Sequence, residues 1–176
     1  MNLQLKRTPG IYVVGFMGAG KTTVGRHLAH RLGWSFFDTD AEIESAENIA
    51  IAEIFATRGE LEFRRIEAAV IAQHVRWIER GRPAVLALGG GAFTQPDNRL
   101  LLQNNGFTVW LDCPFETVQH RVAHATHRPL ARDPEVFAAL YETRRHHYRL
   151  ADVHVPISSD DPEVTVAAIL AHPLFQ

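Results

Sequence analysis

Residues Gly15–Gly25 read GFMGAGKTTVG, and they directly follow the apolar run IYVV at residues 11–14. β-Branched and aromatic residues followed by glycines are typical of a buried strand that ends in a tight loop. The residues after the loop, TTVGRHLAHRL at 22–32, have the apolar spacing of a helix. The sequence therefore predicts a strand, a glycine-rich loop and a helix in succession.

The loop itself, GFMGAGKT, fits the Walker A pattern G-x-x-x-x-G-K-[ST] in the strand–loop–helix context that this motif requires. Backbone N–H groups of such a loop bind phosphate oxygens, and glycines let the chain approach without Cβ clashes. Lys21 is expected to reach the β- and γ-phosphates, and Thr22 to offer its hydroxyl to Mg²⁺. The predicted nucleotide-binding residues of the loop are Gly18, Ala19, Gly20, Lys21, Thr22 and Thr23. A connecting glycine turn without a ligand is the alternative interpretation.

Composition narrows the class of protein. The 176 residues are 46% hydrophobic, enough to bury one core, so we expect a single domain over residues 1–176. A net charge of -2 does not favour a nucleic-acid partner, and no run approaches the roughly 20 apolar residues of a membrane span. The only cysteine, Cys113, cannot form an internal disulfide, which fits a reducing compartment. We expect a cytoplasmic protein with neither nucleic acid nor membrane as a partner.

Strands and helices alternate along the chain. Predicted strands lie at 11–14, 34–40, 84–91, 107–112 and 153–157. Predicted helices lie at 22–32, 60–80, 95–106, 115–125, 136–150 and 159–171, with short helical pieces at 41–59. This alternation predicts an α/β fold with a parallel, helix-covered sheet, whose ligands bind beyond the carboxyl ends of the strands.

Two absent motifs count against particular classes of nucleotide-using enzyme. Lysine occurs only at positions 6 and 21, so the guanine-reading motif N-K-x-D is absent, which counts against a GTPase. The catalytic motif H-R-D of protein kinases is absent as well. Nearly all of the basic residues are arginines, so a lysine inside the glycine loop is not expected to be a default choice, because a compact ammonium fits a phosphate pocket differently from a planar guanidinium.

Two aspartates in FFDTD follow the second predicted strand. If the chain is extended there, the side chains of Asp38 and Asp40 point the same way, roughly 6 to 7 Å apart. In a phosphoryl-transfer site, one carboxylate could hold Mg²⁺ through water while the other accepts a proton from the attacking hydroxyl. The alternative is that Asp40 only caps the following helix.

Two further features of the sequence concern the side of the predicted site where a phosphoryl acceptor would bind. Arg64 and Glu67 are spaced i, i+3 on one helix, where they pair or jointly orient a substrate; taken alone, a solvated ion pair is the favoured interpretation. Gly89, Gly90 and Gly91 form a triplet at a predicted strand end, and a plain turn needs fewer glycines.

These motifs together resemble shikimate kinases. GFMGAGKTTVG, FFDTD, EIFATRGELEFRRIE, LGGGA and HRPLA occur in that family's order and with similar spacing over nearly the whole chain. The resemblance implies a three-layer α/β/α P-loop kinase fold with a central, mainly parallel five-stranded sheet. It also implies a substrate-binding helical region at about 39–70 and a mobile lid at about 122–135. The implied reaction is ATP-dependent phosphorylation of the 3-hydroxyl of shikimate, with Mg²⁺ as the metal.

The resemblance also implies roles on the acceptor side. By its position in D-T-D, Asp38 resembles the family's residue on the metal side of the site. Asp40 resembles the residue that contacts the shikimate hydroxyl and acts as its base. Arg64 is similar to a binder of the substrate carboxylate, a planar anion that suits a bidentate guanidinium. The triplet Gly89, Gly90 and Gly91 is similar to the backbone wall of the shikimate pocket, with Phe63 and Glu67 as support.

Arginines near the predicted lid complete the implied site. Arg128, in RPLA, is expected to stabilise the transferring phosphoryl group while the lid excludes water, and Arg121 resembles a second nucleotide-side arginine. Arg144 keeps the family's spacing to Tyr148 and is expected to grip the substrate carboxylate, although Arg145 is a competitor. The segment VPISSDDPEV at 155–164 is expected near the adenine.

Two alternative functions stay open at this point. A related kinase could use another hydroxy acid such as gluconate, and turnover rates would distinguish the acceptors. A ligand-sensing module could keep the fold without activity, although this chain retains Lys21, Asp40, Arg64 and Arg128 together. The family habit implies a monomer.

Overall fold

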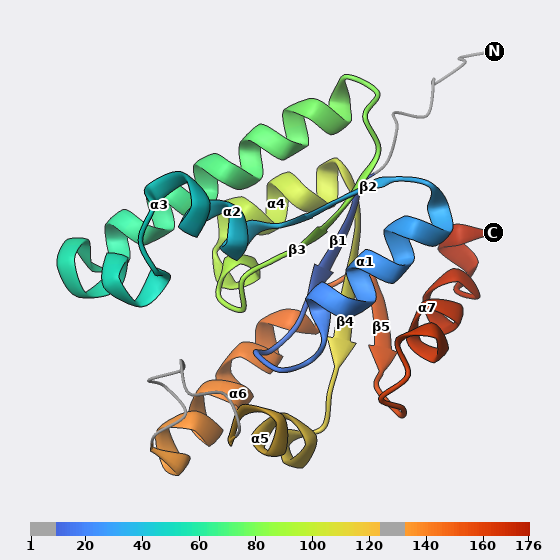
Figure 1. Ribbon diagram of the computed structural model, residues 1–176. Coiled ribbons are helices and arrows are strands. Elements are labelled where there is room, and N and C mark those ends of the chain that lie inside the picture. Colours follow the sequence, from blue (N-terminus) through green and yellow to red (C-terminus); the bar gives the residue numbers. More distant parts are fainter. Residues whose placement is uncertain (1–9, 124–132) are drawn as a thin grey trace.

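The computed structural model describes residues 10–123 and 133–176, and its centre is a five-stranded parallel sheet in the order β2-β3-β1-β4-β5 (Figure 1). The strands are β1 (Gly10–Val14), β2 (Ser35–Asp38), β3 (Ala84–Ala87), β4 (Gly106–Asp112) and β5 (Val153–Pro156). The strands β1 and β3 are buried along their whole length, which explains their continuous apolar sequences. The predicted α/β fold with a parallel five-stranded sheet is confirmed.

Helices cover both faces of this sheet. The main helices are α1 (Lys21–Leu32), α2 (Thr39–Glu47), α3 (Ile51–Glu79), α4 (Pro96–Asn104), α5 (Phe115–Ala123), α6 (Pro134–Tyr148) and α7 (Pro162–Leu170). Within residues 10–123 and 133–176, the short 3-10 helices η1 (Ala92–Thr94) and η3 (Pro173–Phe175) were not predicted. α1 packs beside α7 on one face, and α3 packs beside α4 on the other (Figure 1). Among the described residues, no helix is both long and apolar enough to cross a membrane.

The long helix α3 is interrupted at Gly59, whose φ of 82° and ψ of 170° are not helical. The residues before it form a short helix, and the residues after it form the predicted helix of about 60–80. The interruption lets the first piece fold back against α2, where Ile43, Ile54 and Phe63 form a small apolar cluster separate from the main core. The predicted substrate-binding region, about 39–70, thus has a core of its own.

A buried histidine ties α2 to α3. His74 on α3 has its Nε2 atom 2.6 Å from Glu42 Oε2 on α2, and its ring lies against Phe37 and Trp77. The side chain of His74 is 1% exposed. This contact holds the first turn of α2, which carries Asp40, against the helix that carries Arg64.

The close pairing of β1 and β4 begins at two glycines, Gly10 and Gly106. A Cβ atom on Gly106 would overlap the carbonyl oxygen of Gly10, and a strand backbone cannot move aside without breaking the pairing.

Gly106→Ala is therefore expected to lower the free energy of unfolding by about 1–3 kcal/mol, measured by urea denaturation. Gly33→Ala, where φ is 67° and nothing lies within 4 Å of the added Cβ, serves as a comparison that carries only backbone strain, about 1 kcal/mol. Equal losses in both variants would contradict a steric role for Gly106.

Candidate active site

The loop between β1 and α1 has the conformation that a phosphate-binding loop requires. Gly15, Gly18 and Gly20 all have positive φ, at 148°, 79° and 91°. No side chain among the described residues caps α1, and its first turn carries no acidic residue, so its N-terminus can accept an anion. Lys21 Nζ donates to the carbonyl oxygen of Phe16 at 3.0 Å, which lays the ammonium along the loop. The loop therefore brings the Lys21 ammonium and the N-terminus of α1 to the same end of β1.

Asp38, the last residue of β2, connects this loop to α2. Its Oδ2 accepts a hydrogen bond from Thr22 Oγ1 at 2.5 Å, and its Oδ1 accepts from the backbone N–H groups of Asp40 and Ala41. Asp38 is thus the N-cap of α2, and the interpretation of Asp40 as that cap is wrong. The hydroxyl of Thr22 and the carboxylate of Asp38 are oxygen ligands of the kind that Mg²⁺ prefers, so these residues fit the metal.

The predicted extended geometry of Asp38 and Asp40 is also wrong. Because Asp38 caps a helix that begins at Thr39, Asp40 lies in the first turn of α2 instead of two positions along a strand. The two side chains consequently contact different loops. Asp38 reaches Thr22 at the nucleotide loop, whereas Asp40 lies against Gly89. The two carboxylates therefore lie at the ends of two neighbouring strands, β1 and β3.

The glycine triplet follows β3, at the carboxyl edge of the sheet, and each glycine lies against a polar side chain. A Cβ on Gly89 would stand 2.5 Å from Asp40 Oδ1 and 3.1 Å from Glu67 Oε2. A Cβ on Gly90 would stand 2.8 Å from Arg144 Nη1, and one on Gly91 would overlap the guanidinium of Arg64. The charged neighbours of the triplet are thus two acids and two arginines, Asp40, Glu67, Arg64 and Arg144. A Cβ atom at any of the three positions would require one of these side chains to move.

The pair of Arg64 and Glu67 is buried, so its interpretation as a solvated ion pair is wrong. Arg64 Nη1 donates to Glu67 Oε1 at 2.8 Å, and the two side chains are only 16% and 1% exposed. Burial raises the pKa of Glu67, and the nearby Asp40 raises it further, against the opposing effect of Arg64. Among the described residues, Arg64 Nε and Glu67 Oε2 have no hydrogen-bond partner. Buried polar atoms without partners are uncommon and suit a site that receives a polar ligand.

The raised pKa of Glu67 has a consequence for stability. The folded state holds this proton at a pH where the unfolded chain, near the ordinary value of 4.5, has lost it. Stability therefore falls as pH rises from about 4.5 through the folded pKa, and the loss is complete above it. Glu67→Gln has no such proton, so its free energy of unfolding relative to the unmodified chain should be higher at pH 8 than at pH 5 in urea denaturation.

Glu62→Gln is the matched control for that measurement. The Glu62 side chain is 34% exposed, against 1% for Glu67, and its hydrogen bond to Arg65 lowers its pKa, so the control should show either no pH trend or the opposite one. An equal trend in both variants would show that burial of Glu67 is not the cause.

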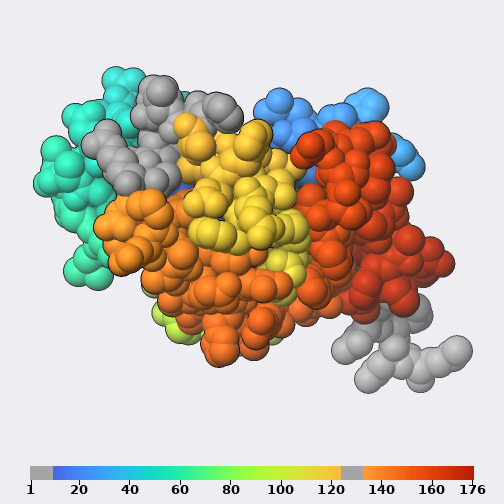
Figure 2. Space-filling view, turned by 90° about the horizontal axis from the view of Figure 1, so that it is seen from below, coloured from blue at the N-terminus to red at the C-terminus, as the bar shows by residue number. Residues whose placement is uncertain are grey.

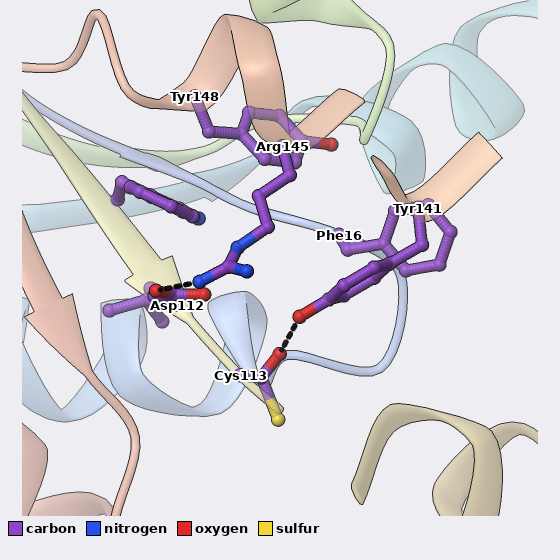
Figure 3. A pocket seen from close by; sticks show the side chains of 8 residues that line it. Phe16, Asp112, Cys113, Tyr141, Arg145 and Tyr148 are labelled. Carbon is purple, nitrogen blue, oxygen red and sulfur yellow. Dashed lines mark hydrogen bonds and ion pairs between the residues drawn. The ribbon is translucent and has the colours of Figure 1, made fainter. Parts of the chain in front are cut away.

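Helix α6 places two neighbouring arginines in different surroundings. Arg144 lies beside Gly90 and over the ring of Phe16, and burial lowers its pKa. Arg145 instead donates from Nη2 to Asp112 Oδ2 at 2.9 Å (Figure 3). Tyr148, one turn later, donates its hydroxyl to the carbonyl oxygen of Gly90 at 2.5 Å. Of the two competing arginines, Arg144 is the one that faces the triplet.

Arg121, on α5, bridges the nucleotide loop and the segment after β5. Its Nη1 donates to the Gly18 carbonyl oxygen at 2.9 Å, and its Nη2 pairs with Asp160 Oδ1 at 2.5 Å. An open hollow of about 370 Å³ lies here, lined by Glu116, Thr117, His120, Arg121 and Asp160. In the space-filling view, the surface of α5 lies between those of α6 and the β5–α7 segment (Figure 2). The segment expected near the adenine thus meets the predicted nucleotide-side arginine.

Two residues near the site were not predicted from the sequence, and one predicted site residue lies in a segment that the structure does not describe. Asp112 and Phe16 were not singled out, although Asp112 ends a parallel strand at the edge where ligands bind, which was the available signal. Arg128 and most of the predicted lid, 122–135, lie outside the described residues.

Comparisons with known proteins agree with this site. A family model described as shikimate kinase matches residues 17–172. A shikimate kinase of Ruegeria pomeroyi is 48% identical over 148 residues, which cover 82% of this chain and 74% of that protein. The solved structure of a shikimate kinase from Acinetobacter baumannii in complex with shikimate has a TM-score of 0.84 and 39% identity, covering 92% of this chain and 90% of that one.

A more distant structure bears on the alternative acceptor. A gluconokinase from Sinorhizobium meliloti has a TM-score of 0.55 and 17% identity, covering 94% of this chain and 91% of that one. At this identity the likeness shows the fold alone. The family model and the relatives that are 48% and 39% identical are all shikimate kinases, so gluconate is not favoured and the chain belongs to the shikimate kinase family.

Proposed function

We propose that this chain transfers the γ-phosphoryl group of ATP to the 3-hydroxyl of shikimate, giving 3-phosphoshikimate and ADP, in the biosynthesis of chorismate and aromatic amino acids. The observation that carries the proposal is the glycine triplet next to Asp40, Glu67, Arg64 and Arg144 at the carboxyl edge of β3. β3 is the direct neighbour of β1, whose carboxyl end begins the nucleotide loop. A small polar acid bound at the triplet would lie beside the phosphates.

Shikimate fits the charges of this acceptor site. Arg64 and Arg144 are the proposed partners of its carboxylate, since two guanidinium groups can bind a planar anion in fixed geometry. Asp40 is the proposed partner and general base of the 3-hydroxyl, and Gly89, Gly90 and Gly91 form the proposed backbone wall. The shikimate bound in the Acinetobacter baumannii relative supports the choice of acid.

The proposed nucleotide site is formed by the loop and two arginines. Gly18, Ala19, Gly20, Lys21, Thr22 and Thr23 would bind the phosphates, and Lys21 would stabilise charge on the transferring group. Arg121 is proposed as a nucleotide contact, supported by its bond to the Gly18 carbonyl. Arg128, from the proposed lid at 122–135, is proposed to stabilise the transferring phosphoryl group, on the strength of its place in RPLA.

Thr22 and Asp38 would hold Mg²⁺, supported by their adjacent oxygens. The metal supplies neutralisation of phosphate charge when it is bound. Asp38 also caps α2, so the same side chain would orient the metal ligand Thr22 and the helix that carries Asp40. We further propose a single domain that acts as a monomer in the cytoplasm, without nucleic-acid or membrane partners, as family habit and composition suggest.

The proposal is tested by measuring ADP release from Mg·ATP with and without shikimate, gluconate and other hydroxy acids. Strong stimulation by shikimate alone is expected. Stimulation by another acid would replace the substrate, and tight shikimate binding without ADP release would favour a ligand-sensing module. Magnesium is tested in the same assay, since EDTA should abolish turnover and added Mg²⁺ should restore it.

A further inference from the structure

Asp112, at the carboxyl end of β4, accepts two hydrogen bonds or ion pairs at one oxygen. Arg145 Nη2 from α6 lies 2.9 Å from Asp112 Oδ2, and His154 Nε2 from β5 lies 2.8 Å from the same atom. The Asp112 side chain is 11% exposed. The carboxylate therefore joins the end of α6 to two neighbouring strands, and the proposed reaction gives none of these three groups a role.

The guanidinium of Arg145 is held from several sides. It lies over the ring of Trp110 at 5.6 Å and near that of Tyr141 at 6.0 Å. The Trp110 ring is in turn stacked on His154, with 4.4 Å between centroids. A small cavity of about 10 Å³ lies among these side chains, and Phe16 of the nucleotide loop lines it too (Figure 3). Cation–π contacts and an ion pair together give this side chain one fixed direction.

Arg144 and Arg145 are neighbours on α6, so contacts that hold Arg145 also restrain the helix at Arg144. Successive residues of an α-helix point about 100° apart, so fixing one side chain on the last turns of α6 sets the rotation of its neighbour. Two further bonds hold the same helix: Tyr141 donates to the carbonyl oxygen of Cys113 at 2.8 Å, and Tyr148 donates to that of Gly90. Tyr148 fixes α6 at the triplet, whereas Arg145 and Tyr141 fix it at the end of β4.

We propose that Arg145, held by Asp112, is a positioning residue that aims Arg144 into the acceptor site. This inference rests on the proposed role of Arg144 as a partner of the substrate carboxylate. Arg145 itself is not among the side chains nearest to the triplet, and its guanidinium is turned toward Asp112 at the end of β4. Its effect on the reaction passes through Arg144.

The inference is tested with Arg145→Met and the isosteric Asp112→Asn, with folding checked by circular dichroism. Each is expected to raise KM for shikimate about tenfold, to leave KM for ATP within about twofold, and to have no additive effect when combined. Arg145→Lys should recover part of the affinity, since an ammonium still pairs with Asp112 but lacks the planar fork. Arg65→Met removes an exposed arginine paired with Glu62 on α3 and should change neither KM.

The deciding measurement repeats Arg145→Met in the background of Arg144→Met. A residue that acts through Arg144 has no further effect once Arg144 is absent, so KM for shikimate should match that of Arg144→Met alone. A loss of thermal stability with unchanged KM for shikimate would overturn the inference, as would an additional tenfold rise in that background. If Arg144→Met alone leaves KM for shikimate unchanged, the proposed role of Arg144 fails, and the inference about Arg145 fails with it. This single variant therefore distinguishes an error in the proposed site from an error in the positioning role of Arg145.

Discussion

Replacing Asp40 with asparagine is expected to lower kcat for shikimate phosphorylation by about 10²-fold or more, the usual contribution of a general base. Asparagine keeps the shape of the side chain but cannot take the hydroxyl proton. Binding of Mg·ATP should stay within about twofold, because Asp40 lies against Gly89 while Asp38 contacts the nucleotide loop. Steady-state kinetics gives the first quantity, and calorimetric titration with Mg·ATP the second.

Asp97→Asn is the control for that experiment. Asp97 is also an aspartate in the first turn of a helix, but it lies exposed on α4, and its replacement should leave kcat unchanged. A normal kcat in Asp40→Asn would remove Asp40 from the base role and direct attention to Glu67, the other carboxylate at the triplet.

Replacing Arg64 with alanine is expected to lower kcat/KM for shikimate by about 10²-fold, mainly through KM, since a buried charged partner of the carboxylate is lost. KM for ATP should change little. The same change leaves Glu67 buried without its partner, so the free energy of unfolding should fall as well, by about 3 kcal/mol. Substrate kinetics and urea denaturation of one preparation measure both effects.

The double variant Arg64→Ala, Glu67→Gln separates these effects. Removing the buried carboxylate should restore most of the stability but none of the affinity for shikimate. Arg65→Ala, at the neighbouring exposed position, should alter neither. Recovery of shikimate affinity in the double variant would mean that Arg64 serves only to neutralise Glu67, and a selective rise in KM for ATP would contradict its place in the acceptor site.

Local patterns in the sequence were enough to predict the fold. Glycines that end apolar runs, at 15–20 and at 89–91, marked two neighbouring strand ends, and the alternation of strands with helices predicted the parallel sheet. These features depend on neighbours in sequence and on burial, which a pattern records directly. The break at Gly59 was likewise visible as a division between short helical pieces and the helix of about 60–80.

Side-chain directions could not be predicted in the same way. The residue that caps α2 depends on where β2 ends. Because β2 ends at Asp38, Asp38 is the cap and Asp40 lies in the helix, so the two carboxylates contact different loops. The spacing of Arg64 and Glu67 predicts a pair but not its burial, which comes from the packing of α3 against the triplet. The choice between Arg144 and Arg145 was open because the partner that holds Arg145, Asp112, lies 33 residues away in the chain.

The glycine triplet also limits how this enzyme could escape a compound that occupies its acceptor pocket. Resistance commonly arises when a larger side chain narrows a pocket wall. At Gly89, Gly90 and Gly91, any added side chain would instead displace Asp40, Arg144 or Arg64, which the reaction is proposed to need. An inhibitor that makes its contacts with this backbone would therefore meet a wall whose alteration displaces a side chain that the proposed reaction uses.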